Sequence, residues 1–320
     1  MCRGRRLTDK SQTSEVRYLE VDPETAGQRL DNYLLSRLKG VPRSHVYRLI
    51  RSGQVRVNSG RVTAKYRLAR GDSVRVPPVR SRSPAALPGK GAGLDWLEER
   101  VIFEDDRLIV VDKPAGLAVH GGSGLEFGLI EGFRSIRPAA KSLELVHRLD
   151  RATSGCIMIA KRRSTLRRLH ALLREGRIHK RYLALVQGQW QHGEIDVETP
   201  LMVSPGNAAV RVRADADGKP ARSRFRLVEH FGSFASLVEV TIPTGRTHQI
   251  RVHAASVGHA IAGDDRYGSR EFNSECRARG LQRTFLHAQF IEFVWPDSDE
   301  EFVVNAPLPD ELRRFLDVIA

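Results

Sequence analysis

The pattern of apolar and polar side chains predicts a small two-helix unit at the start of the chain. Polar and apolar residues alternate over residues 17–22, which indicates a short strand. Leucines and a tyrosine at helical spacing predict one helix over residues 27–39 and a second over residues 44–53, each ended by a glycine. Two more short strands are predicted at residues 55–58 and 72–77, around a turn.

Composition then suggests where the units of the chain begin and end. Residues 1–16 are polar and without pattern, so we expect a disordered tail. Residues 17–78 form the small unit described above. Proline, glycine, serine and alanine dominate residues 79–96, which indicates a flexible linker. Residues 97–320 are expected to form a second, larger domain.

The larger domain shows more strand than helix. The predicted elements are strands at residues 108–112, 155–160, 181–186, 222–229 and 234–242, and helices at residues 163–175 and 247–257. Strands in this proportion predict an α+β domain on a mixed, largely antiparallel sheet.

Positive charge is concentrated in the first third of the chain. The formal net charge is +14; residues 1–96 hold 20 Lys and Arg against 8 Asp and Glu, which leaves 32 against 30 in residues 97–320. A basic module beside a near-neutral one indicates a nucleic-acid-binding domain joined to a catalytic domain. A generally Arg-rich chain is the alternative, but it does not explain the asymmetry.

Several classes of protein are disfavoured by what the sequence lacks. No apolar run reaches the ~20 residues needed to cross a bilayer. The basic N-terminus is not followed by the apolar run of a secretory signal. The three cysteines lie far apart and match no metal-ligand spacing. We therefore expect a cytoplasmic protein without a metal site.

The second predicted helix carries arginines on the side opposite its apolar positions. A solvated helix face is the alternative explanation. The order of an Arg29-Leu-Asp helix, a second helix and then Gly53-Gln-Val-Arg-Val-Asn58 resembles the S4 RNA-binding domain, a small α/β module. The resemblance implies RNA contacts, mainly to phosphates, from five arginines. These are Arg29, Arg43, Arg48, Arg51 and Arg56.

One carboxylate in the larger domain is a candidate for chemistry. Asp150 lies in a polar turn before a predicted buried strand, between Arg148 and Arg151. Neighbouring guanidinium groups favour the ionised form of a carboxylate, which can act as a nucleophile or base. A structural ion pair is the alternative. A glycosidase would need two such carboxylates, and Asp264 with Asp265 supplies only a weaker second candidate.

Two long motifs carry a family resemblance. His147-Arg-Leu-Asp-Arg-Ala-Thr-Ser-Gly155, followed by Gly245-Arg-Thr-His-Gln-Ile-Arg-Val-His253, strongly resembles the RluA-type pseudouridine synthases. The resemblance covers about residues 97–310. It implies the pseudouridine synthase fold and an isomerisation of uridine in RNA, in which the N1–C1′ bond breaks and a C5–C1′ bond forms. No cofactor is expected for this reaction.

The same resemblance assigns expected roles within the site. Asp150 would be the essential carboxylate, Tyr182 would stack on the uracil, and Arg251 would pair with Asp150. Arg148 would fill the space left by an extruded uridine. The remaining assignments are Ile250 as an apolar wall, and His147, with His248 and His253, as hydrogen-bonding support.

The S4-like module narrows the resemblance to synthases that act on the RNA of the large ribosomal subunit. We therefore expect 23S rRNA, free or in an assembling large subunit, as partner and substrate. Two alternatives stay open: the same reaction on tRNA, and an RNA-binding assembly factor without catalysis.

Overall fold

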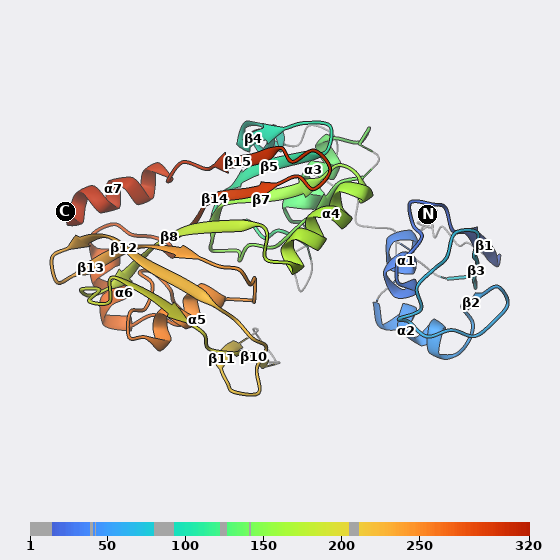
Figure 1. Cartoon of the computed structure of the whole chain (residues 1–320), viewed down its shortest axis with the longest axis horizontal. Coiled ribbons are helices and arrows are strands. Elements are labelled where there is room, and N and C mark those ends of the chain that lie inside the picture. The colour runs from blue at the N-terminus through green and yellow to red at the C-terminus, as the bar shows by residue number, and fades with distance from the viewer. Residues whose placement is uncertain are drawn as a thin grey trace, which may run out of the picture. The chain divides into compact units, whose positions relative to one another are not determined.

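The computed structural model describes residues 15–38, 41, 43–79, 93–121, 127–140, 142–204 and 211–320. The chain divides into two compact units, Met1–Gly89 and Lys90–Ala320 (Figure 1). Most of the expected disordered tail and most of the expected linker lie outside the described residues.

The small unit combines two helices with a three-stranded antiparallel sheet in the order β1-β3-β2. Its elements are β1 (Arg17–Glu20), α1 (Leu30–Arg37), α2 (Arg43–Arg51), β2 (Arg56–Val57) and β3 (Ser73–Val76). The helices bury the leucines, valines and tyrosine that predicted them, among them Leu30, Tyr33 and Leu49. Helix α1 begins only at Leu30, because the backbone of Arg29 is still extended.

Asp31 ties the two helices of the small unit together. Its side chain is 2% exposed and accepts hydrogen bonds from Arg29 Nη2 at 2.6 Å and Tyr47 Oη at 2.8 Å. A buried carboxylate is tolerated when such donors satisfy it. The Arg-Leu-Asp motif therefore stabilises this fold through the contacts of Asp31.

The large unit is built on one ten-stranded sheet (Figure 1). Its order is β4-β5-β7-β14-β8-β13-β12-β9, with β15 paired to β14 and β6 paired to β7. Only β7 and β14 pair in parallel, and the other pairs in this sheet are antiparallel. The prediction of an α+β domain with a mixed, largely antiparallel sheet is confirmed.

The remaining bounds are as follows. The strands are β4 (Val101–Glu104), β5 (Leu108–Lys113), β6 (Glu144–Leu145), β7 (Ser154–Ala160), β8 (His179–Gln187), β9 (Glu194–Val197), β10 (Leu201–Ser204), β11 (Arg211–Ala214), β12 (Ser223–Phe231), β13 (Ala235–Thr241), β14 (Leu286–Val294) and β15 (Glu301–Asn305). The helices are a 3-10 helix (Asp95–Arg100), α3 (Leu129–Ile136), α4 (Arg163–Arg174), α5 (Gln249–Ser256), α6 (Arg270–Ala278) and α7 (Asp310–Ile319).

A glycine lets the two parallel strands meet at the centre of the sheet. Gly155 on β7 pairs with Ala288 on β14, and Ala288 pairs on its other side with Tyr182 on β8. Gly155 has φ +107°, and a Cβ there would lie 2.2 Å from the carbonyl oxygen of Ala288. Only glycine permits this approach, which brings the turn before β7 to within two strands of Tyr182.

Candidate active site

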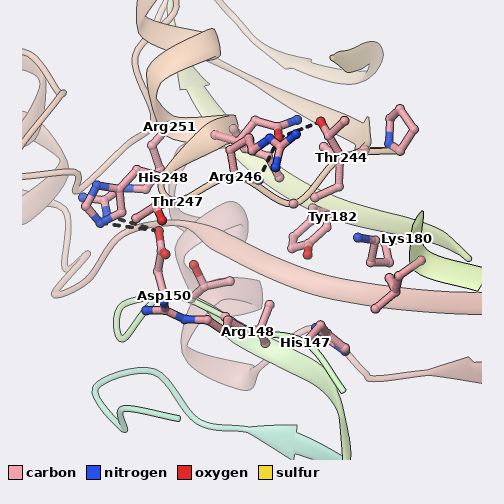
Figure 2. Close-up of a pocket in the computed structure, with 18 of the residues that line it drawn as sticks. His147, Arg148, Asp150, Lys180, Tyr182, Thr244, Arg246, Thr247, His248 and Arg251 are labelled. Atoms are coloured by element: carbon pink, nitrogen blue, oxygen red, sulfur yellow. Dashed lines mark hydrogen bonds and ion pairs between the residues drawn. The ribbon is translucent and has the colours of Figure 1, made fainter. Parts of the chain in front are cut away.

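A pocket of about 530 Å³ opens where three segments of the large unit meet. They are the turn before β7, strand β8, and the segment that leads into α5 (Figure 2). Seven of the eight residues given roles in the site line this pocket: His147, Arg148, Asp150, Tyr182, His248, Ile250 and Arg251. His253 is not part of its lining. Side chains more than a hundred residues apart in sequence are therefore brought together.

The turn that carries Asp150 is anchored from the end of β5. The N–H of Thr153 donates to the carbonyl oxygen of Asp150 at 3.1 Å, and Arg151 exchanges two hydrogen bonds with Gly116, each 2.8 Å long. The fully buried amine of Lys113 donates to the carbonyl oxygens of Pro114 and Leu117, both at 2.9 Å. The turn thus presents Asp150 from a fixed backbone.

The cation that pairs with Asp150 is Arg251, not either flanking arginine. Arg251 Nη1 donates to Asp150 Oδ2 at 3.3 Å, whereas Arg151 donates to Gly116 and Arg148 is exposed at the pocket. Oδ1 of Asp150 receives no hydrogen bond from the described residues. One oxygen of the carboxylate is therefore held, and the residue lines the pocket.

Asp264 holds Arg251 through the two guanidinium nitrogens that do not contact Asp150. Arg251 Nε and Nη2 donate to the two oxygens of Asp264 at 2.7 and 2.8 Å. Asp264 is fully buried and also accepts the backbone N–H groups of Arg266 and Tyr267. Burial alone would raise the pKa of Asp264, but Arg251 lowers it overall; burial alone would lower the pKa of Arg251, but the two carboxylates raise it overall.

His248 faces the same oxygen of Asp150. Its Nε2 lies 4.0 Å from Asp150 Oδ2, beyond hydrogen-bond length. Tyr267 Oη lies 2.8 Å from His248 Nδ1 and accepts the N–H of Val212 at 3.1 Å. If the phenol donates its own proton to Nδ1, the proton of a neutral His248 sits on Nε2, facing Asp150. Burial lowers the pKa of His248, which favours the neutral ring.

Tyr182 and Ile250 form the apolar part of the pocket. Tyr182 is 6% exposed and Ile250 is 5% exposed. Burial, with Asp150 nearby, raises the pKa of Tyr182 far above its usual value, so the phenol stays neutral. Among the described residues the Tyr182 hydroxyl has no hydrogen-bond partner, and it points into the pocket in Figure 2.

Two histidines of the motifs have structural hydrogen bonds. His147 Nε2 accepts the N–H of Met158 at 3.2 Å, and burial lowers the pKa of His147 to about 3. His253 lies 2.9 Å from both the Ser223 hydroxyl and the Thr199 carbonyl oxygen. The ring of His147 is therefore neutral, and one of its nitrogens is occupied within the fold.

Sequence reasoning assigned no role to Lys180, which also lines the pocket. It precedes Tyr182 by two residues on β8, so both side chains lie on the same face of the strand. The residue is 5% exposed, and burial lowers its pKa to about 8. Its place two residues before Tyr182 could be read from the sequence, but its burial could not.

The five arginines expected to contact RNA differ in their surroundings. Arg48, Arg51 and Arg56 are exposed. Arg29 is paired with Asp31, and the side chain of Arg43 lies outside the described residues. Their contacts with RNA stay a prediction.

Two negative findings concern only the part of the chain that the structure describes. No helix there is long and apolar enough to cross a membrane. No group of three or more His, Cys, Asp or Glu side chains there is arranged to hold a metal ion.

The chain matches two family models and several named proteins. Residues 107–256 match the RNA pseudouridylate synthase family, and residues 28–74 match the S4 domain. The chain is 49% identical over 310 residues to the ribosomal large subunit pseudouridine synthase C of Yersinia pestis, covering 96% of this chain and 97% of that protein. Identity to the protein of the same name from Escherichia coli (strain K12) is 47% over 312 residues, covering 96% and 98%.

A solved structure agrees at the level of the fold. The human RNA pseudouridylate synthase domain containing 4 superposes with a TM-score of 0.59 at 22% identity, covering 71% of this chain and 95% of that one. With relatives nearly half identical over almost the whole length, the chain belongs to the RNA pseudouridine synthase family, with an S4 RNA-binding domain at residues 28–74.

Proposed function

We propose that this enzyme converts uridines to pseudouridine in the 23S RNA of the large ribosomal subunit, with Asp150 as the essential carboxylate. The names of the relatives, which match this chain almost from end to end, support the substrate. The observation that carries the proposal for the site is the Asp150–Arg251 pair in a pocket beside Tyr182.

The reaction needs a carboxylate that is held in place and an uncharged aromatic ring on which the uracil can stack. The N1–C1′ bond of uridine breaks, the base turns, a C5–C1′ bond forms, and C5 loses a proton while N1 gains one. Arg251 holds Oδ2 of Asp150, so Oδ1 is the oxygen directed at the nucleoside. The neutral phenol of Tyr182 lies under the uracil, with Ile250 as the wall beside it.

The pocket requires a uridine that has left its helix. Extruding a base costs a few kcal/mol, part of which an inserted cationic side chain offsets. Arg148 is exposed at the pocket and supplies that cation. The S4 domain adds sequence-independent affinity through phosphate contacts.

A deletion strain tests both the substrate and the site. Chemical mapping of its 23S rRNA should show one or more pseudouridines missing. A plasmid with the wild-type gene should restore them, and a plasmid with Asp150→Asn should not. An unchanged ribosomal map with a pseudouridine lost from tRNA would overturn the substrate, while restoration by Asp150→Asn would overturn the role of Asp150.

A further inference from the structure

Lys180 is a buried cation in the pocket without a counterion. No described residue accepts a hydrogen bond from its amine, and no described carboxylate forms an ion pair with it. The residue is nonetheless only 5% exposed, and it lines the pocket. Figure 2 shows its nitrogen directed toward the space beside Tyr182.

The surroundings of the amine leave it open to a ligand. The exposed backbone of Gly245 runs beside it, so close that a Cβ at Gly245 would lie 3.8 Å from Lys180 Nζ. Glycine places no side chain in that space. Arg174 and Arg246 are exposed and line the same pocket, so its lining carries further positive charge.

An uncompensated buried ammonium group is costly to the folded protein. Removing a charge from water is unfavourable unless an opposite charge or hydrogen-bond partner compensates for the lost hydration. The described part of the protein offers Lys180 no such partner, so an anionic ligand would supply the missing counterion. In an RNA substrate the anionic groups are the backbone phosphates.

We propose that Lys180 binds the backbone phosphate next to the uridine that is held at Asp150. The inference rests on the proposed function, because it takes RNA in this pocket as given. Two residues of a strand span about 7 Å. Tyr182 therefore faces the nucleoside while Lys180, on the same face of β8, faces a phosphate beside it.

The test compares Lys180→Met with Lys161→Met. Both changes remove one lysine charge, but Lys161 does not line the pocket and is paired with Glu104 at 2.6 Å. The probe is a short stem-loop carrying the uridine that the mapping experiment identifies, whether in rRNA or in tRNA. Lys180→Met should weaken binding about tenfold and flatten the slope of log affinity against log salt by ~0.7–0.9, whereas Lys161→Met should leave both nearly unchanged.

Stability separates a binding role from a structural one. Because Lys180 has no partner, Lys180→Met should leave the free energy of unfolding unchanged or raise it. A structural lysine would show the opposite, a loss of stability. Loss of stability together with unchanged affinity and salt slope would overturn the proposal.

A neutral phosphate analogue tests the contact in the unaltered enzyme. A methylphosphonate on one side of the target uridine should weaken binding to wild type about tenfold and have little effect on Lys180→Met. Equal loss with both proteins at every flanking position would overturn the proposal. The stem-loop carries whichever uridine the mapping experiment identifies. If the substrate is not ribosomal RNA, the mapping therefore shows it, and the binding test of Lys180 stays valid.

Discussion

Asp264 holds Arg251 through two hydrogen bonds of 2.7 and 2.8 Å, both shorter than the 3.3 Å contact from Arg251 to Asp150. The orientation of Arg251 is thus set mainly by a carboxylate outside the pocket. Only Nη1 of the guanidinium is left to face Asp150. Asp264 thus fixes the arginine, and Oδ1 of Asp150 receives no hydrogen bond from the described residues.

We predict that Asp264 matters for stability far more than its neighbour does. Asp264→Asn leaves the buried Arg251 with one weaker carboxylate contact, and breaking such a pair costs about 3–5 kcal/mol. Asp265→Asn is the matched control, since Asp265 is 85% exposed in a surface ion pair with Arg277, which contributes ~1 kcal/mol or less. Chemical denaturation measures both, and equal effects would contradict the assigned geometry.

Arg251 should show strong coupling to Asp264 in a double-mutant cycle. Arg251→Met alone leaves Asp264 buried and unpaired, so we expect a loss of several kcal/mol. Adding Asp264→Asn removes that orphaned charge and should restore part of the stability. Turnover should fall at least ~100-fold in both proteins, because Asp150 loses its donor. If the two losses of stability simply add, or the double variant is active, the pairing is wrongly drawn.

The motifs identified seven of the residues that line the pocket, but neither Lys180 nor the hydrogen bonds among the residues. Asp150 and Arg251 could be matched because their motifs are long and occur in order along the chain. The bond from Arg251 to Asp264 could not, because a sequence gives no distance between residues on separate elements. For the same reason the flanking Arg148 and Arg151 were natural candidates for pairing with Asp150.

The fold, too, could be predicted from the sequence only in part. Buried apolar runs predicted β5 and β7, since those strands are covered on both faces. Helix α6 was missed because it is mostly polar and buries only Phe272, Asn273 and Cys276. The row that joins Gly155, Ala288 and Tyr182 depends on long-range strand pairing, which local periodicity does not contain.

Asp150→Asn should abolish turnover and leave RNA binding intact. The change keeps the shape of the side chain but removes the charge required for nucleophilic or basic action. Affinity comes mainly from phosphate contacts and should be preserved. Single-turnover assays on purified protein measure the first effect and filter binding the second. Mass spectrometry has to exclude back-deamidation, after which appreciable turnover would end the assignment.

The S4 domain should contribute to the salt dependence of binding through its exposed arginines. Replacing Arg48 and Arg51 together by Gln removes two cations from α2, and we expect the slope of log affinity against log salt to flatten by about 1.4–1.8. Turnover at saturating RNA should be unchanged, because neither residue lines the pocket.

Arg29→Gln provides the contrast within the same domain. Arg29 pairs with the buried Asp31, so its loss should lower the stability of the domain more than it changes the salt slope. A salt slope that stays at the wild-type value in the Arg48 and Arg51 variant would show that this face does not contact phosphates.

Lys180 should make the free energy of unfolding depend on pH in the alkaline range. Burial lowers the pKa of Lys180 from 10.5 to about 8. Between these values the unfolded chain binds more protons at this site than the folded one, so the free energy of unfolding rises with pH across that window. Lys180→Met lacks this contribution. From about pH 8 to about pH 10, stability should therefore shift in favour of wild type over the variant, by on the order of 3 kcal/mol at most. Urea denaturation over a pH series measures the difference in the free energy of unfolding between the two proteins. If that difference does not change with pH, Lys180 keeps its ordinary pKa, and the description of it as buried without a counterion is wrong.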